Sequence, residues 1–210
     1  MINHKLDEIV ITETIQQAVN RYNIPGGWTR DEPCVSSFKD EIKGKLIANQ
    51  NGKCAYCGLP LSSRNPEIDH IAPKGGPKRP YHTECTFLPI NLVYACHHCN
   101  SSGCKGQNDT VESKNGTTNY RRWSFKIVHP YLDDPTEYFE FDENENENEN
   151  VLSLPKRDAD AVKKQKAKYT IDMFGLDTEP ILTELAKQAF FERQPDTIKG
   201  IITEISTYRP

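Results

Sequence analysis

Two cysteine pairs, CAYC at positions 54–57 and CHHC at positions 96–99, carry the strongest structural signal in this sequence. A spacing of two residues lets both thiolates of one turn reach the same ion, and two such turns complete a tetrahedral zinc site. The 38 residues between the pairs exceed the roughly 15–20 of a compact zinc ribbon, so further structure must lie between them. We predict a structural Zn²⁺ site formed by Cys54, Cys57, Cys96 and Cys99. Five other residues could substitute as ligands: Cys85, Cys104, His82, His97 and His98.

Length and composition favour a protein with its own hydrophobic core. The chain has 210 residues, of which 36% are hydrophobic. The N-terminus, MINHKLDEIVITE, contains no apolar segment, and no stretch approaches about 18 consecutive apolar residues. Seven cysteines is an odd number, and cytosolic thiols stay reduced, so metal binding is favoured over disulfides. We expect a cytoplasmic protein with neither an export signal nor a membrane span.

Charge is distributed unevenly along the chain. The net charge is −4, yet eight Lys or Arg residues face only three acidic residues between Ile71 and Lys126. Seven of the acidic residues outside that segment lie between Glu137 and Glu149. A local basic face could therefore bind nucleic acid despite the acidic total, although solvated loops would show the same composition.

Apolar periodicity predicts helices on both sides of the cysteine pairs. Ser36 or Ser37 can cap a helix in which Phe38, Ile42 and Leu46 recur every fourth residue. Short strands are expected around position 68 and within FLPINLVYAC.

The C-terminal part is also expected to be helical. Val162, Tyr169 and Met173 fall on one face of a Lys-rich stretch, and apolar stripes follow at 181–190 and 198–205. We interpret all of these segments as simple packing helices.

These patterns suggest three regions. Residues 1–52 form an N-terminal helical region, residues 53–126 a core with the four-cysteine zinc site, and residues 127–210 a C-terminal helical region. The last region contains DENENENEN, an acidic low-complexity insert at 142–150 with no apolar face.

The stretch EIDHIAPKGG places Asp69 directly before His70. By itself, this histidine could be a zinc ligand, a general base or a hydrogen-bonded core residue. Phosphodiester hydrolysis needs a base to activate water and a divalent cation to stabilise the leaving oxygen. Neighbouring residues of a strand point to opposite faces, so both side chains can serve one site only if the strand ends there. The Pro-Lys-Gly-Gly sequence at 73–76 supplies that change of direction.

The combined order of motifs resembles the HNH endonucleases of the ββα-metal fold. It runs C-x-x-C, Asp-His-Ile-x-Pro-Lys, Asn-Leu, C-x-x-C-Asn and Lys-Gly, from about Gly52 to Gly106. The resemblance implies an α+β protein in which a small zinc-stapled ββα-metal core is embedded in a mostly helical N- and C-terminal surround. It also implies a metal-dependent nuclease that hydrolyses phosphodiester bonds, with DNA a better candidate than RNA.

The resemblance assigns a role to each matching residue. His70 would be the general base, and Asp69 and Asn100 would hold the catalytic Mg²⁺ or Mn²⁺. Asn91 would brace the loop between the two strands. The family often has histidine where this chain has Asn100, so His97 or His98 could replace it as ligand. The expected phosphate contacts are basic: Lys74, Lys78, Arg79, Lys105, Arg121 and Arg122.

Shorter stretches resemble a narrower subgroup. GKCAYCG, HPYLDDPTEYFEF and KYTIDMFGLDTEPIL, followed by Arg193, are similar to stand-alone bacterial HNH proteins. These include the HNH component (PtuB) of Septu-type and retron-associated antiphage systems, which implies a separate PtuA-like ATPase as partner. This chain has no G-x-x-x-x-G-K-[ST] motif of its own. The alternatives are a McrA-like restriction nuclease and a non-catalytic zinc-dependent module that binds nucleic acid or protein.

Overall fold

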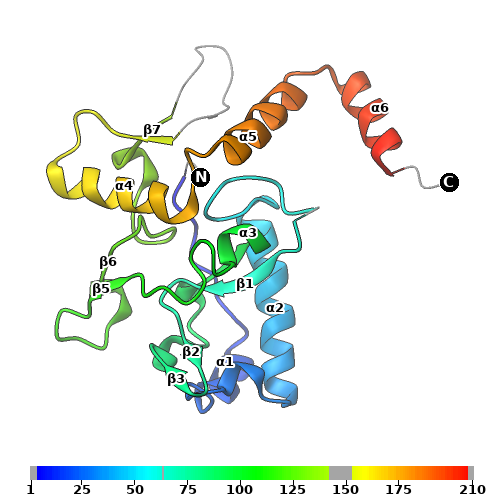
Figure 1. Ribbon diagram of the computed structural model, residues 1–210. Coiled ribbons are helices and arrows are strands. Elements are labelled where there is room, and N and C mark those ends of the chain that lie inside the picture. The colour runs from blue at the N-terminus through cyan, green and yellow to red at the C-terminus, as the bar shows by residue number, and fades with distance from the viewer. Residues whose placement is uncertain (1–3, 63, 142–152, 208–210) are drawn as a thin grey trace.

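The computed structural model describes residues 4–62, 64–141 and 153–207, and it combines helices with short antiparallel strands (Figure 1). This mixed content agrees with the α+β class, while the acidic insert at 142–150 lies outside the described residues. The helices are α1 (Glu13–Asn20), α2 (Pro33–Asn49), α3 (His97–Asn100), α4 (Ala161–Phe174), α5 (Glu179–Glu192) and α6 (Asp196–Thr207). The strands are β1 (Glu67–His70), β2 (Gly75–Gly76), β3 (Arg79–Pro80), β4 (Leu92–Ala95), β5 (Val111–Ser113), β6 (Ser124–Phe125), β7 (Phe139–Phe141) and β8 (Ser153–Pro155). Short 3-10 turns lie at Gly27–Thr29, Thr83–Cys85, Pro89–Asn91, Tyr120–Arg122 and Pro135–Glu137.

The centre of the molecule is an antiparallel pair formed by β1 and β4. Their register sets Asp69 opposite Val93 and His70 opposite Leu92. All four residues of β4 are buried, as expected for a strand covered on both faces. The short helix α3 follows β4 after a single residue and packs against β1. Along the chain, the β2–β3 hairpin is inserted between β1 and β4, and the cysteine pairs lie before β1 and after β4.

Helix α2 packs against β4. Val35, Phe38, Ile42 and Leu46 form its fully buried stripe, which confirms the periodicity seen in the sequence. The helix begins at Pro33, three residues before the expected serine cap, because proline is well suited to the first turn of a helix.

The end of α2 is tied directly to β4. Gln50, which is 1% exposed, donates from Nε2 to the backbone oxygen of Tyr94 (2.7 Å) and accepts from the backbone nitrogen of Tyr94 (2.7 Å). The side-chain amide of Gln50 thus pairs with the backbone of β4 at Tyr94 as a neighbouring strand would. It also donates to the backbone oxygen of Lys53 (2.7 Å), which positions the turn that carries the first cysteine pair.

Helix α4 packs through a different face from the expected one. Asp160 caps it by accepting from the backbone nitrogen of Lys163 (2.9 Å), and the helix ends at Gly175. Its buried residues are Ala167, Thr170, Ile171 and Phe174. The prediction that Val162, Tyr169 and Met173 lie on the packed face is wrong for the first two, which are 76% and 37% exposed, whereas Met173 packs partly buried against the core. The buried face uses a small residue, two β-branched residues and a phenylalanine that the sequence pattern did not single out.

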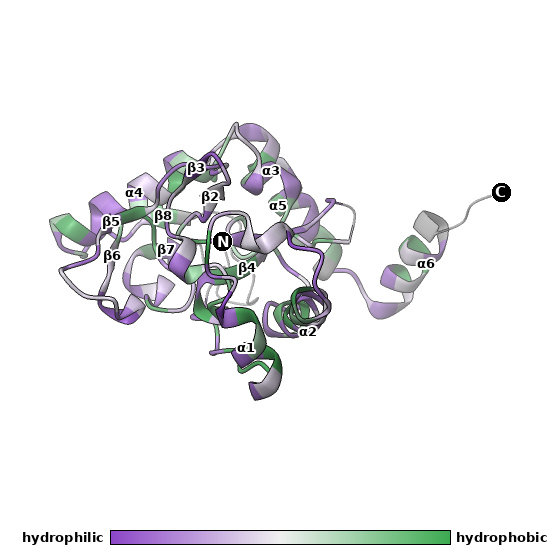
Figure 2. Cartoon of the chain, turned by 90° about the horizontal axis from the view of Figure 1, so that it is seen from below, coloured by the Kyte–Doolittle hydropathy of each residue, from purple (hydrophilic) through white to green (hydrophobic). Residues whose placement is uncertain are grey.

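Helix α6 extends away from the rest of the molecule (Figures 1 and 2), whereas α5 still contacts it, since Glu184 forms an ion pair with Arg64. Ile181 and Ala189 of α5 are buried, but Phe190 is 67% exposed. Ile198, Ile201 and Ile202 of α6 are 40%, 49% and 41% exposed. The expectation of simple packing helices is therefore wrong for α6, while α5 does pack through Ile181 and Ala189. Within the described residues, no helix has both the length and the apolar character that a membrane crossing requires.

The buried stripe of α2 gives a matched stability test. Ile42 is fully buried and Ile47, on the same helix, is 39% exposed. We expect Ile42→Ala to lower the free energy of unfolding by about 2–5 kcal/mol because it removes buried methyl groups and leaves a cavity. Ile47→Ala should cost less than about 1 kcal/mol. Urea unfolding of both variants measures this difference, and equal losses would contradict the packing of α2.

Candidate metal centre and active site

Four cysteines meet where the turn after α2 packs against the junction of β4 and α3. The sulfur atoms of Cys54, Cys57, Cys96 and Cys99 all lie within 4.8 Å of one another, and all four residues are buried. Among the described residues, this is the one group of three or more His, Cys, Asp or Glu side chains arranged to hold a metal ion. The set matches the predicted ligands, and a four-thiolate cluster of this kind suits zinc. Neither His97 nor His98 takes part, since both are exposed.

The thiols interact strongly with one another in a buried setting. Burial raises the pKa of Cys54, whereas hydrogen bonding from Cys54 lowers the pKa of Cys96. The backbone nitrogen of Cys96 also donates to the sulfur of Cys54 (3.4 Å). A dication would supply the positive charge that several adjacent thiolates need in order to coexist.

His70 lies at the end of β1 with a defined tautomer. Its Nε2 is 3.0 Å from the backbone oxygen of Thr86. A carbonyl oxygen only accepts, so Nε2 must carry the proton and Nδ1 is left with its lone pair. The ring of Trp28 meets the imidazole edge-on, with centroids 4.7 Å apart. Burial, reinforced by Lys74, lowers the pKa of His70 well below its ordinary value, so the imidazole is neutral at neutral pH.

Asp69 is held by two side chains that sequence reasoning did not assign to it. The hydroxyl of Tyr56 donates to Oδ2 (2.5 Å), and Nζ of Lys105 donates to Oδ1 (2.9 Å). Lys105 is 1% exposed and also donates to the backbone oxygen of His70 (2.7 Å). Burial and the Asp69 carboxylate raise the pKa of Tyr56, which keeps it a hydrogen-bond donor. The carboxylate is thus fixed from both sides.

Asn91 is fully buried and joins three segments. Its Oδ1 accepts from the backbone nitrogen of Ala72 (2.7 Å), and its Nδ2 donates to the backbone oxygens of Ala72 (3.1 Å) and Cys85 (3.0 Å). The hydroxyl of Tyr120 also donates to Oδ1 (2.8 Å). These bonds hold the start of the loop after β1 against β4. Tyr120 continues the network to His129, whose Nε2 is 3.0 Å away.

Asn100 ends α3 on the same side as Asp69. Its Nδ2 donates to Oε2 of Glu67 (2.7 Å), which leaves the amide oxygen as an acceptor. Asp69, His70 and Asn100 all line one hollow of about 490 Å³, together with Ile68, Pro73, Lys74, Gly75, Ser102, Lys105, Gly106 and Gln107. We call it the Asp69 hollow. Neither His97 nor His98 lines it, so geometry favours Asn100 as the third polar group of this site.

The basic residues fall into three groups. Lys74 and Lys105 line the Asp69 hollow, and Lys105 points inward to Asp69 rather than to solvent. Lys78 and Arg79 are exposed on the β2–β3 hairpin. Arg121 lines a separate hollow and forms an ion pair with Glu8, and Arg122 is exposed beside it. Contact of any of these residues with nucleic acid stays a prediction.

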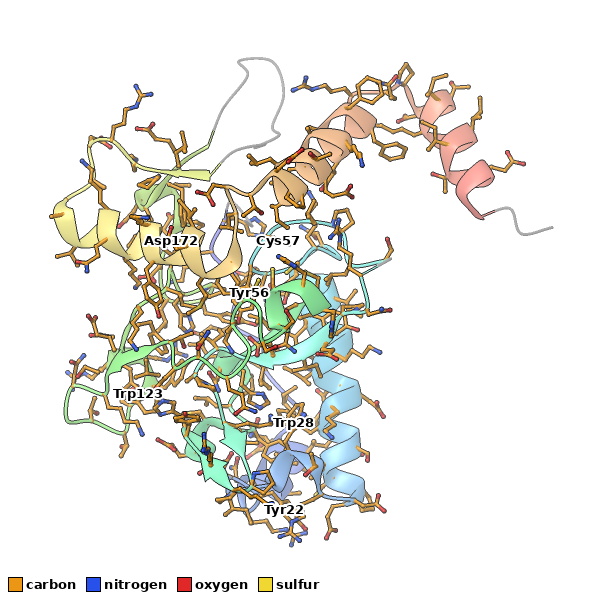
Figure 3. The ribbon with its side chains drawn as sticks, in the orientation of Figure 1. Tyr22, Trp28, Tyr56, Cys57, Trp123 and Asp172 are labelled. Atoms are coloured by element: carbon orange, nitrogen blue, oxygen red, sulfur yellow. The ribbon has the colours of Figure 1, made fainter. Side chains whose placement is uncertain are left out.

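Three contributors to the site were missed by sequence reasoning, namely Tyr56, Thr86 and Trp28. Tyr56 was visible as one of the two residues between Cys54 and Cys57, and an aromatic residue inside a cysteine turn is a usable signal (Figure 3). Thr86 acts through its backbone oxygen, which no side-chain pattern reveals. Trp28 comes from the N-terminal region and reaches His70 only through tertiary packing.

Comparison with known proteins relates part of the chain to an endonuclease. No protein-family profile matches it. A stretch of 66 residues, 31% of this chain, is 43% identical to the CRISPR-associated endonuclease Cas9 of Corynebacterium diphtheriae and covers 6% of that protein. A stretch of 104 residues, 50% of this chain, is 28% identical to protein ea31 of Escherichia phage lambda and covers 27% of it. The chain thus spans a minor part of each relative.

Removal of zinc tests the cysteine cluster. We expect about one zinc per chain in gently purified protein, and chelation should lower the melting temperature by ~10 °C or more because the metal contributes folding energy. Cys57→Ser should reproduce much of this loss. Cys34→Ser is the matched control, since Cys34 lies outside the cluster. Elemental analysis well below one zinc per chain would contradict the site.

The buried His129 predicts a pH dependence of stability. Burial lowers its pKa well below the ordinary value, so the folded protein keeps it neutral while the unfolded chain takes up a proton below about pH 6.5. The unfolded state then binds more protons, and the free energy of unfolding falls as the pH falls below that value. His129→Gln should make this slope shallower by up to ~1.4 kcal/mol per pH unit between about pH 6.5 and 5. Urea unfolding at each pH measures the free energy of unfolding. An equally steep dependence on pH in the wild type and in His129→Gln would refute the prediction.

Proposed function

We propose that this chain is an HNH-type metal-dependent endonuclease that hydrolyses phosphodiester bonds of nucleic acid, with DNA as its first candidate substrate. The hydrogen bond between His70 Nε2 and the Thr86 carbonyl carries the proposal. It leaves Nδ1 unprotonated, and His70 lines the same hollow as Asp69 and Asn100. The local similarity to the endonuclease Cas9 supports the same class.

His70 would act as the general base. The neutral imidazole can take a proton from an attacking water at Nδ1, and the Nε2 hydrogen bond to Thr86 then stabilises the imidazolium that forms. The edge-on contact with Trp28 holds the ring in orientation. The lowered pKa of His70 keeps the base unprotonated at neutral pH.

Asp69 and Asn100 would hold the divalent cation. Mg²⁺ and Mn²⁺ prefer oxygen ligands and keep several waters, so one carboxylate and one amide oxygen suffice. Both side chains line the same hollow, and a carboxylate retains further lone pairs after accepting from Tyr56 and Lys105. The bound cation would stabilise charge on the leaving oxygen. The ammonium of Lys105 places a further positive charge beside the Asp69 carboxylate.

Lys74 would contact the scissile phosphate. It is half-buried in the Asp69 hollow, and burial lowers the pKa of its ammonium. The exposed Lys78 and Arg79 would extend the contact along the backbone without reading sequence.

The biological setting we propose is antiphage defence together with a PtuA-like ATPase. The support is the sequence resemblance to PtuB-type HNH proteins, and ATP chemistry would come from the partner because this sequence has no phosphate-binding glycine loop. A McrA-like restriction nuclease would share the same site. A non-catalytic zinc module is less well supported, since binding alone does not require a histidine with a fixed tautomer beside an ordered carboxylate.

Cleavage of plasmid DNA in Mg²⁺ or Mn²⁺ tests the assignment. We expect His70→Ala to reduce the rate by about 100-fold or more, the usual contribution of a general base. His97→Ala is the matched control, because this exposed histidine lies outside the Asp69 hollow, and it should cleave like the wild type. Melting temperatures of both variants show whether each is folded. Equal cleavage by the wild type and a folded His70→Ala protein would contradict the assignment of His70 as the general base.

A further inference from the structure

A second, smaller hollow adjoins the Asp69 hollow. Its volume is about 170 Å³, and it shares Lys74, Gly75 and Gln107 with the Asp69 hollow. Trp28 and Gly76 line its other walls, so we call it the Trp28 hollow. Pockets for drug-sized ligands usually measure about 300–1,000 Å³, so this one suits a single small group.

Two loops that are distant in sequence enclose the Trp28 hollow. One runs through Gly26 and Trp28 before α2, and the other is the β2–β3 turn at Pro77. The loops touch at the rim, since a Cβ atom on Gly26 would lie 3.6 Å from Cγ of Pro77. Figure 3 shows Trp28 between α2 and the β2–β3 hairpin. The hollow is thus formed by the N-terminal region together with the core.

The Trp28 ring is a positioned aromatic wall. It packs against Phe87 (centroids 5.5 Å apart) and Phe38 (6.4 Å), and Nζ of Lys39 lies 5.0 Å from its centroid. The side chain is half-buried, so part of it remains accessible. Among the described residues that line this hollow, Lys74 is the one that carries a charge. The hollow therefore suits a neutral, ring-shaped group attached to an anion at Lys74.

We propose that the Trp28 hollow is the subsite for the nucleoside next to the scissile phosphate. The phosphate would lie at Lys74 in the Asp69 hollow, and the sugar or base would pack against Trp28. This inference rests on the proposed nuclease function and adds the element that distinguishes a nucleic acid from other phosphodiesters. Stacking of a base on an aromatic side chain tolerates every base, so the subsite would favour nucleosides without reading sequence.

Gly76 allows the hollow to be filled with little backbone strain. A Cβ atom on Gly76 would meet nothing within 4 Å, whereas one on Gly75 would lie 2.2 Å from the backbone oxygen of Arg79. Gly76→Phe therefore adds a ring at the wall of the Trp28 hollow without a backbone clash, so the protein should stay folded. Gly44→Phe is the matched control, because Gly44 is exposed on α2, lines neither hollow and is equally open.

Two chromogenic phosphodiesters distinguish nucleoside binding in the Trp28 hollow from hydrolysis of the phosphodiester bond. The p-nitrophenyl ester of thymidine 5′-monophosphate carries a nucleoside, whereas methyl p-nitrophenyl phosphate has the same leaving group but only a methyl group in place of the nucleoside. We expect Gly76→Phe to raise KM for the thymidine ester by roughly 5- to 100-fold, the range of one lost stacking contact, and by several-fold more than for the small ester. Gly44→Phe should leave both esters unaffected. Equal changes for the two esters, or none, would overturn the subsite.

A binding measurement keeps this test independent of catalysis. Thymidine 5′-monophosphate should quench the fluorescence of Trp28, read as the difference from a Trp28→Phe variant, and Gly76→Phe should abolish that quenching. If the wild type hydrolyses neither ester but quenching occurs and Gly76→Phe abolishes it, the nuclease proposal fails and the subsite stands. Absence of quenching in the wild type overturns the subsite. Should Gly76→Phe melt well below the wild type, the smaller Gly76→Leu takes its place in both measurements.

Discussion

The mutual approach of four cysteine sulfurs within 4.8 Å is the constraint on which the rest of this structure depends. Each sheet in the described part of the chain has two strands, and two-stranded ribbons are marginally stable by themselves. The cluster joins the turn after α2 to the junction of β4 and α3, so β1 is enclosed between two fixed points. A bound zinc ion would therefore stabilise the region that positions Asp69 and His70.

Tyr56 couples this metal centre to the candidate active site and to the C-terminal region. It lies between Cys54 and Cys57, its hydroxyl donates to Asp69, and its ring stacks on Phe174 of α4 with centroids 4.1 Å apart. Displacement of the cysteine turn would release the carboxylate and uncover α4 together. The packing of α4 is thus directly linked to the geometry of the site.

The two sides of the β1 end have different electrostatic character. Asp69 faces the buried ammonium of Lys105, an arrangement whose desolvation cost offsets much of its attraction and which therefore specifies geometry more than stability. His70 faces Trp28 and the Thr86 carbonyl, in surroundings that favour the neutral imidazole. Asp69 and His70 are the last two residues of β1. Because the strand ends at His70, these neighbours supply an ordered carboxylate and an unprotonated base to the same hollow.

Much of this arrangement follows from the sequence alone. The cysteine spacing determines the metal cluster, the four-residue period determines the buried face of α2, and the Asp-His pair marks the end of a strand. Only the tertiary structure decided that Tyr56 and Lys105 hold Asp69, that Thr86 sets the tautomer of His70 and that α4 buries Phe174 instead of Val162. Local patterns report periodicity and ligand spacing, whereas these contacts join residues far apart in the chain, and their energy exists only once the segments have packed.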